Sequence, residues 1–164
     1  MIDIIVDEGV VEQMNSPLPD DKSIQATVEA ACIEAGLSHV PSLCIRFSDD
    51  VTVQALNLEW RKKDAVTDIL SFPMQEEGEL DVNQPLGDMI FATPFTIQES
   101  ARLALPATDH MLHLIVHGTL HLLGYDHIND DEAEAMHTHE RSVMKKLGLH
   151  DPYPDELYKD ESHG

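Results

Sequence analysis

The fold of this chain is decided by one stretch of its sequence, DHMLHLIVHGTLHLLGYDH, from Asp109 to His127. The spacing predicts a helix from about Asp109 to Leu123, ended by Gly124. Apolar side chains surround this helix on most sides: Met111, Leu112, Leu114, Ile115, Val116, Leu120 and Leu122. A helix that is apolar nearly all round is a buried helix. We therefore expect the other elements to pack around it.

The elements predicted on either side of this central helix alternate between strands and helices early in the chain and are helical late. We predict an α+β fold, with one small mixed β-sheet of about four strands and helices packed on it. The domain is expected to span residues 1–150, followed by a flexible acidic tail over residues 151–164. Strands are predicted at 1–8, 42–48, 68–72 and 87–92, and helices at about 21–35, 49–60, 93–103, 109–123 and 130–147.

Three histidines of the opening stretch have the spacing of a metal site. His117 and His121 lie about 40° apart in rotation and about 6 Å apart along a helix, so their imidazoles can reach one ion. The glycine turn that follows can return His127 to the same point. His113 shares the stripe, but we interpret it as packing or support. Three nitrogen ligands leave a position open for water, which suits Zn²⁺ best, with Ni²⁺, Cu²⁺ or Co²⁺ as alternatives.

The histidine spacing equals that of the peptidase signature H-E-x-x-H-x-x-G-x-x-H, with one difference. The glutamate of that signature acts as the general base, and Gly118 stands in its place. A glycine cannot take a proton from water. The sequence thus indicates a peptidase-like set of ligands without the usual base, and the base stays unassigned. We interpret His137, His139, His150 and His163 as surface groups.

Charge and composition narrow the possible functions. The chain has 164 residues and a formal net charge of −21, which repels nucleic acid at long range. Its basic residues form two clusters, Arg61–Lys63 and Arg141 with Lys145 and Lys146. No segment is long and apolar enough to span a membrane, and the N-terminus does not look like a signal peptide. The two cysteines, Cys32 and Cys44, are expected to be reduced thiols of a cytoplasmic protein.

Three motifs together resemble the YbeY family of bacterial endoribonucleases that mature rRNA. They are NLEWRKKDAVTDILSFP, LGDMIFA and HGTLHLLGYDH, and the resemblance runs from about Ser42 to Leu147. It implies a cytoplasmic metalloenzyme that cleaves single-stranded RNA, matures the 3′ end of 16S rRNA and acts in ribosome quality control. It also implies zinc on His117, His121 and His127, a functional arginine at Arg61, and the small ribosomal subunit and its proteins as partners. Neither a membrane nor DNA is expected as a partner.

Arg61 suits this chemistry because a guanidinium can hold a phosphate through two donors, which a lysine cannot. Its alternatives are an ordinary surface charge or an ion pair with Asp64. Asp126 can orient an imidazole or stabilise the turn before His127. Asp68 and Ser71 can line the site or simply form the end of a strand.

Two other functions stay open on the sequence alone. The first is a ribosome-assembly factor in which the metal is mainly structural, because an acidic surface suits docking on basic proteins. The second is a metallohydrolase of another substrate, such as a peptide. Gly118 argues against the peptide, because the usual base is missing.

Overall fold

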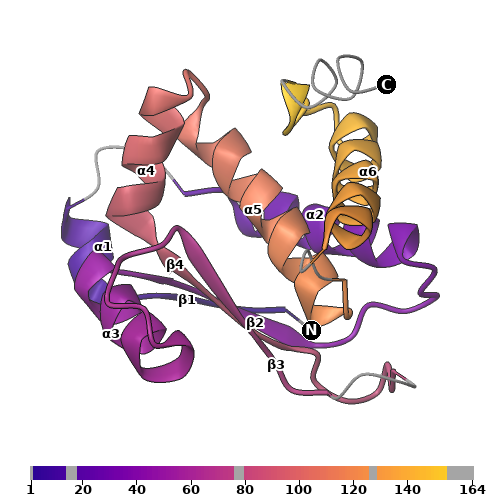
Figure 1. Cartoon of the computed structure of the whole chain (residues 1–164), viewed down its shortest axis with the longest axis horizontal. Coiled ribbons are helices and arrows are strands. Elements are labelled where there is room, and N and C mark those ends of the chain that lie inside the picture. Colours follow the sequence, from indigo (N-terminus) through magenta and orange to yellow (C-terminus); the bar gives the residue numbers. More distant parts are fainter. Residues whose placement is uncertain (1, 14–17, 76–79, 126–128, 155–164) are drawn as a thin grey trace.

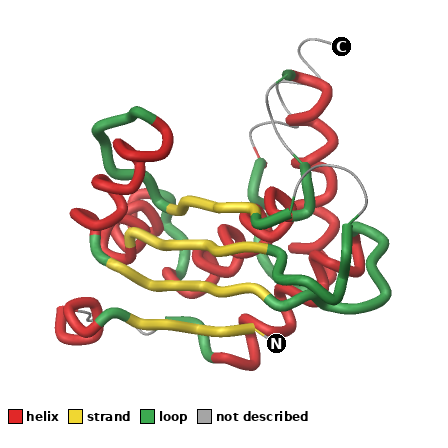
Figure 2. The backbone as a smooth tube through the Cα atoms, turned by 90° about the horizontal axis from the view of Figure 1, so that it is seen from below, coloured by secondary structure: helices red, strands yellow, loops and turns green. Residues whose placement is uncertain are grey.

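A single four-stranded sheet forms the centre of the computed structural model, which describes residues 2–13, 18–75, 80–125 and 129–154. The strands are β1 (Ile2–Val6), β2 (Leu43–Ser48), β3 (Ile69–Pro73) and β4 (Gly87–Ala92). Their order is β1-β2-β4-β3 (Figure 2). The first three in this order run parallel, and β3 pairs antiparallel with β4. The predicted α+β class with a mixed four-stranded sheet is confirmed.

Six helices surround the sheet within the described residues (Figure 1). They are α1 (Glu8–Gln13), α2 (Asp21–Glu34), α3 (Asp50–Arg61), α4 (Thr93–Arg102), α5 (Ala107–Leu122) and α6 (Asp130–Lys146). Helices α2 and α5 cover one face of the sheet, and α3 lies against the other face. Helix α6 packs on the outside of α2 and α5. None of the described helices is long and apolar enough to cross a membrane.

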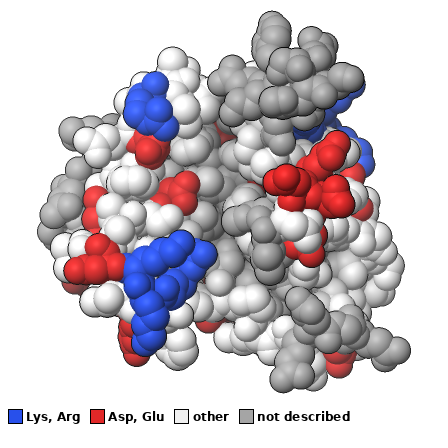
Figure 3. All heavy atoms as spheres, viewed as in Figure 1, with Lys and Arg blue, Asp and Glu red and all other residues white. Residues whose placement is uncertain are grey.

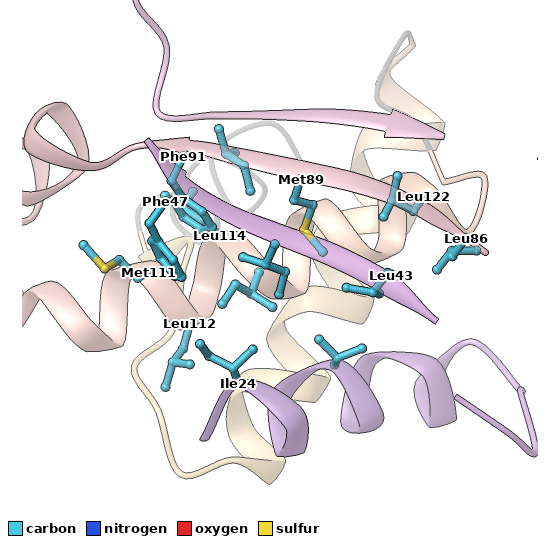
Figure 4. Packing of buried hydrophobic residues seen from close by; sticks show 14 of the residues in the cluster. Ile24, Leu43, Phe47, Leu86, Met89, Phe91, Met111, Leu112, Leu114 and Leu122 are labelled. Carbon is cyan, nitrogen blue, oxygen red and sulfur yellow. The ribbon is translucent and has the colours of Figure 1, made fainter. Parts of the chain in front are cut away.

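Helix α5 lies at the centre of the hydrophobic core, as its sequence predicts. Its side chains pack with those of α2, β2 and β4, including Ile24, Phe47 and Met89 (Figure 4). Successive residues of β4 point to opposite faces, so Met89 and Phe91 meet α5 while Ile90 faces α3. Both faces of the sheet are therefore covered, and α5 is held rigidly along one of them.

Several local details differ from the prediction. Helix α1 follows β1 directly and was not expected. Helix α5 begins at Ala107, two residues before the predicted start at Asp109. In α3, Trp60 lies about two helical turns after the buried Val53 and so on the same side of the helix, yet its side chain is 65% exposed. Asn57 is buried instead, because its amide donates to the carbonyl of Ala65 and fastens the following loop.

The thiols and the chain end also bear on the predictions. Cys32 is buried and Cys44 half-buried, and both are free.

The packed chain extends past residue 150, because Arg141 donates to the carbonyl of Tyr153. Residues 155–164, the greater part of the predicted tail, lie outside the described residues.

Candidate metal centre

One large cleft of about 1030 Å³ lies beside α5. Its walls come from α5, from β3 at the edge of the sheet, from the end of α3, and from residues of α6 and beyond. The cleft holds Arg61, His117 and His121 together, although Arg61 is far from the two histidines in sequence. Asp68 and Ser71 line it as well. The cleft is also lined by His110, His113, Tyr125, Glu132 and Tyr153.

The two helical histidines lie as the periodicity of α5 predicts. The ring centroids of His117 and His121 are 4.7 Å apart, and the rings meet edge to face at 78°. Both side chains are half-buried and line the cleft. His127, the third predicted ligand, and Asp126 lie outside the described residues. Within the described part of the chain, no set of three or more candidate side chains is arranged to hold a metal ion.

Glu140 of α6 is fully buried directly behind these histidines. One carboxylate oxygen, Oε1, accepts hydrogen bonds from His117 Nδ1 at 2.8 Å and from His113 Nε2 at 3.1 Å. The other oxygen, Oε2, accepts from the hydroxyl of Tyr153 at 2.8 Å. Burial would raise the pKa of Glu140, but the hydrogen bonds from His113 and His117 outweigh it and lower the pKa to about 2.

An ionised Glu140 fixes which nitrogen of each histidine carries a proton. A carboxylate can only accept, so Nδ1 of His117 and Nε2 of His113 must donate. Nε2 is then the unprotonated nitrogen of His117, which is the protonation state of the ligand in the common carboxylate–histidine–metal arrangement. His113 has its own Nε2 engaged by Glu140, which agrees with a supporting role. The residues present therefore fit a metal with imidazole ligands.

Three histidines expected on the surface are partly buried instead. His139 donates to Glu34 of α2 at 3.0 Å and packs edge to face on Tyr125. His137 stacks on Tyr153, with ring centroids 3.8 Å apart. His150 meets His113 edge to face. The surface interpretation was wrong for these residues because α6 and the segment after it fold back over α5. His163 lies outside the described residues.

Arg61 reaches the rim of the cleft because α3 ends there. Lys62 adopts a left-handed conformation, with φ of 60°, and stops the helix. The chain then turns back toward β3, whose Ile69, Ser71 and Pro73 line the same cleft. Arg61 makes no ion pair with any described residue. Asp64, its possible partner on sequence grounds, accepts from Gln54 instead.

Gly118 allows α5 to lie close to the sheet. A Cβ atom at this position would collide with Sδ of Met89 and would stand 3.2 Å from Cδ1 of Ile69. The position thus faces packed apolar side chains of β4 and β3. This close α5–sheet contact favours glycine at the position of the signature's glutamate, because a larger side chain would have to displace Met89.

Glu140 and Tyr153 are the parts of the site that sequence reasoning missed. The signal for Glu140 was its spacing, because it lies four residues after the buried Met136 and four before the buried Met144. A charged residue on the buried stripe of a helix usually has a specific partner. Nothing in the sequence distinguishes Tyr153 from the rest of the acidic tail.

On the prediction that His117 is a metal ligand, replacing Glu140 by glutamine is expected to weaken zinc binding about tenfold to a hundredfold, because the charged acceptor that orients His117 is lost. The fold should persist, since glutamine has the same size and one carbonyl oxygen. Competition with a chromophoric chelator measures the affinity. Glu134→Gln, an exposed change on the same helix, is the matched control. Equal zinc affinity of all three proteins would contradict the role given to Glu140.

Comparisons with known proteins identify a family that matches most of this chain and a solved structure with a similar fold. The family model described as endoribonuclease YbeY matches residues 11–148. A relative named endoribonuclease YbeY from Rhizorhabdus wittichii is 44% identical over 138 residues, covering 80% of each chain. One of the same name from Azorhizobium caulinodans is 42% identical over 156 residues, covering 93% of this chain and 95% of its own. The solution structure of TM1509 from Thermotoga maritima has a similar fold, with a TM-score of 0.53 and 19% identity over 93% of this chain and 98% of that one.

Proposed function

This chain belongs to the YbeY family of endoribonucleases, and from that premise we propose that it is a metal-dependent hydrolase of single-stranded RNA. Its proposed substrate is precursor 16S rRNA, which it would cleave in maturation of the 3′ end and in ribosome quality control. The observation that carries the proposal is the cleft that Arg61, His117 and His121 share. A phosphate-binding group and candidate metal ligands thus face one space.

The metal is proposed to be a single Zn²⁺ ion held by His117, His121 and His127. Support comes from the neighbouring imidazoles of the first two and from Glu140, which accepts from Nδ1 of His117 and so makes Nε2 its unprotonated nitrogen. When bound, zinc supplies Lewis acidity at the scissile phosphate and a water molecule that ionises near neutral pH. Ni²⁺, Cu²⁺ and Co²⁺ are compatible with the same nitrogen donors.

The chain's own residues account for how the substrate is held. The guanidinium of Arg61 is expected to grip a phosphate of the RNA with two donors. His113 and Tyr153 stabilise the charge of Glu140, which in turn orients His117. The side chain of His117 is only 20% exposed, so a phosphate has to enter the cleft to approach it. A flexible single strand can do this more easily than a rigid duplex.

The basic and acidic side chains lie on separate parts of the surface, which suggests where a chain with a net charge of −21 can bind RNA. Figure 3 shows basic side chains gathered near the end of α3 and acidic side chains over α6 on the same face of the molecule. Arg61, Lys62 and Lys63 are all exposed at the first of these positions. We propose that this basic cluster meets the RNA, while the acidic surface suits basic proteins of the small ribosomal subunit. The proposed location is the bacterial cytoplasm.

Reversing the charge of Arg61 tests this proposal. Arg61→Glu is expected to lower kcat/KM for a single-stranded RNA from the 3′ end of the 16S precursor by about a hundredfold. Arg61→Lys should keep part of the activity, because it preserves the charge but loses the two-pronged contact. The same RNA annealed to its complement should resist cleavage by the wild type.

Arg102→Glu is the control for the change in net charge. Arg102 is exposed at the end of α4, pairs with Glu99 and does not line the cleft. This variant should cleave at nearly the wild-type rate. Equal cleavage by Arg61→Glu and the wild type would refute the role of Arg61 and point to a contaminating nuclease.

A further inference from the structure

Trp60 is a large, exposed aromatic side chain that directly precedes Arg61, the residue of α3 that lines the cleft. It is the single tryptophan of the chain, and its side chain is 65% exposed. Its ring meets Phe72 of β3 edge to face, with centroids 6.3 Å apart. Phe72 packs with Val53 and Ile90, so this contact places the indole on the face of β3 that is turned toward α3. Apolar side chains on the other side of the same strand, such as Ile69, line the cleft.

Trp60 adjoins a concentration of positive charge. Arg61, Lys62 and Lys63 follow it directly and supply three of the ten basic residues in a chain of net charge −21. Four other basic residues, Arg46, Arg102, Arg141 and Lys146, are engaged in ion pairs with carboxylates. The end of α3 thus joins an exposed ring to a cluster of cations that continues into the cleft through Arg61.

An exposed aromatic beside a basic track is how proteins bind single-stranded nucleic acid. The cations contact the backbone, and a base stacks on the ring whatever its identity. The ring of Trp60 contacts Phe72, and the three residues that follow it in the chain are exposed cations, which attract a nucleic-acid backbone. Charge complementarity and continuity with the cleft therefore favour RNA as the occupant.

We propose that Trp60 is a stacking platform for a base of the RNA strand, next to the phosphate that Arg61 holds. This inference rests on the proposed function and extends it. The strand would leave the cleft over the edge of β3 and place an unpaired base on the indole. Bases in a duplex are already stacked on one another, so the platform adds to the preference for single strands.

The single tryptophan lets its own fluorescence report the contact. In a His117→Ala background, which is expected to leave the RNA intact, a short single-stranded oligouridylate should quench the emission saturably. The same oligonucleotide annealed to oligoadenylate should not. No change in emission with the single strand at saturating concentration would overturn the platform.

The steady-state kinetics of RNA cleavage provide the second test of this proposal. Trp60→Ala is expected to raise KM for single-stranded RNA about tenfold while kcat stays within about twofold, because stacking holds the substrate without touching the reacting atoms. Trp60→Phe should keep KM within about threefold. Val51→Ala, an exposed apolar change at the other end of α3, is the matched control and should leave KM unchanged. A wild-type KM for Trp60→Ala would overturn the proposal.

The fluorescence and cleavage experiments distinguish a failure of this inference from a failure of the proposed function. Cleavage by the wild type without quenching of Trp60 overturns only the platform. Quenching without cleavage supports the platform and overturns the endonuclease function. The fluorescence arm keeps the native tryptophan, so it decides the matter even where Trp60→Ala fails to fold.

Discussion

His117→Ala is expected to lower the rate of RNA cleavage by about a hundredfold or more and to remove the bound zinc. The change deletes the imidazole that Glu140 orients at 2.8 Å and leaves at most two of the three proposed ligands. Loss of the charge stabilisation that a metal gives at a phosphate costs several kcal/mol in the transition state, and each 1.4 kcal/mol is about a factor of ten. His121→Ala should behave in the same way.

Zinc content by mass spectrometry and cleavage of single-stranded RNA measure this effect side by side. His39→Ala is the matched control, because His39 is exposed and does not line the cleft. It should retain both zinc and activity. A His117→Ala protein that cleaves RNA at the full rate after its zinc is lost would contradict a metal-dependent reaction. A His117→Ala protein that no longer cleaves RNA but still associates with small ribosomal subunits and restores rRNA processing in cells would favour an assembly factor with a structural metal. Melting curves for each variant separate loss of metal from loss of fold.

Gly118→Glu is expected to unfold the protein and not to create a peptidase, although it completes the peptidase signature. The new side chain would point at Met89 and Ile69, where even a Cβ atom requires the buried side chain of Met89 to move. Overpacking a core costs about 1–3 kcal/mol, and burying a carboxylate without a partner adds several more. Together these approach the total stability of a typical domain, about 5–15 kcal/mol.

Urea denaturation followed by circular dichroism measures this loss. Gly9→Glu is the matched control, because Gly9 lies in helix α1 with open space around it. The same substitution there should change the free energy of unfolding little. A Gly118→Glu protein as stable as Gly9→Glu, or one that hydrolyses a peptide, would contradict the packing explanation.

Much of the fold could be predicted because its signals are local. The side chains of Asp20, Asp49 and Asn129, residue types that favour helix N-termini, each accept a hydrogen bond from a backbone N–H three residues later. Gly124 ends the central helix in a left-handed conformation, with φ of 103°. The apolar surface of that helix is equally local, and it is buried as predicted. Such signals need only a few neighbouring residues.

Strand order could not be predicted, because pairing joins distant segments. Strand β4 lies between β2 and β3, and the alternation of Met89 and Ile90 reflects two buried faces without naming the neighbours. Trp60 fits the apolar stripe of its helix just as Val53 does. Only the position of the sheet edge decides that Val53 is buried and Trp60 exposed.

In the candidate site, too, local features could be predicted from the sequence, whereas contacts between distant segments could not. The closeness of His117 and His121 follows from helix geometry, so spacing alone predicts it. That Arg61 reaches the same cleft depends on how α3 ends near β3, and the sequence indicated it only through the family resemblance. Glu140 stands among many acids in α6, and its burial follows from the packing of α6 on α5. His127, outside the described residues, stays a prediction as the third ligand.

Diffraction at the zinc absorption edge, from crystals of the full chain with a non-cleavable single-stranded RNA, tests the central claim most directly. The account predicts one anomalous peak within about 2.0–2.1 Å of imidazole nitrogens of His117, His121 and His127. An RNA phosphate should lie beside it within hydrogen-bonding reach of Arg61. A zinc peak away from these histidines, or RNA bound on a face without Arg61, would contradict the account.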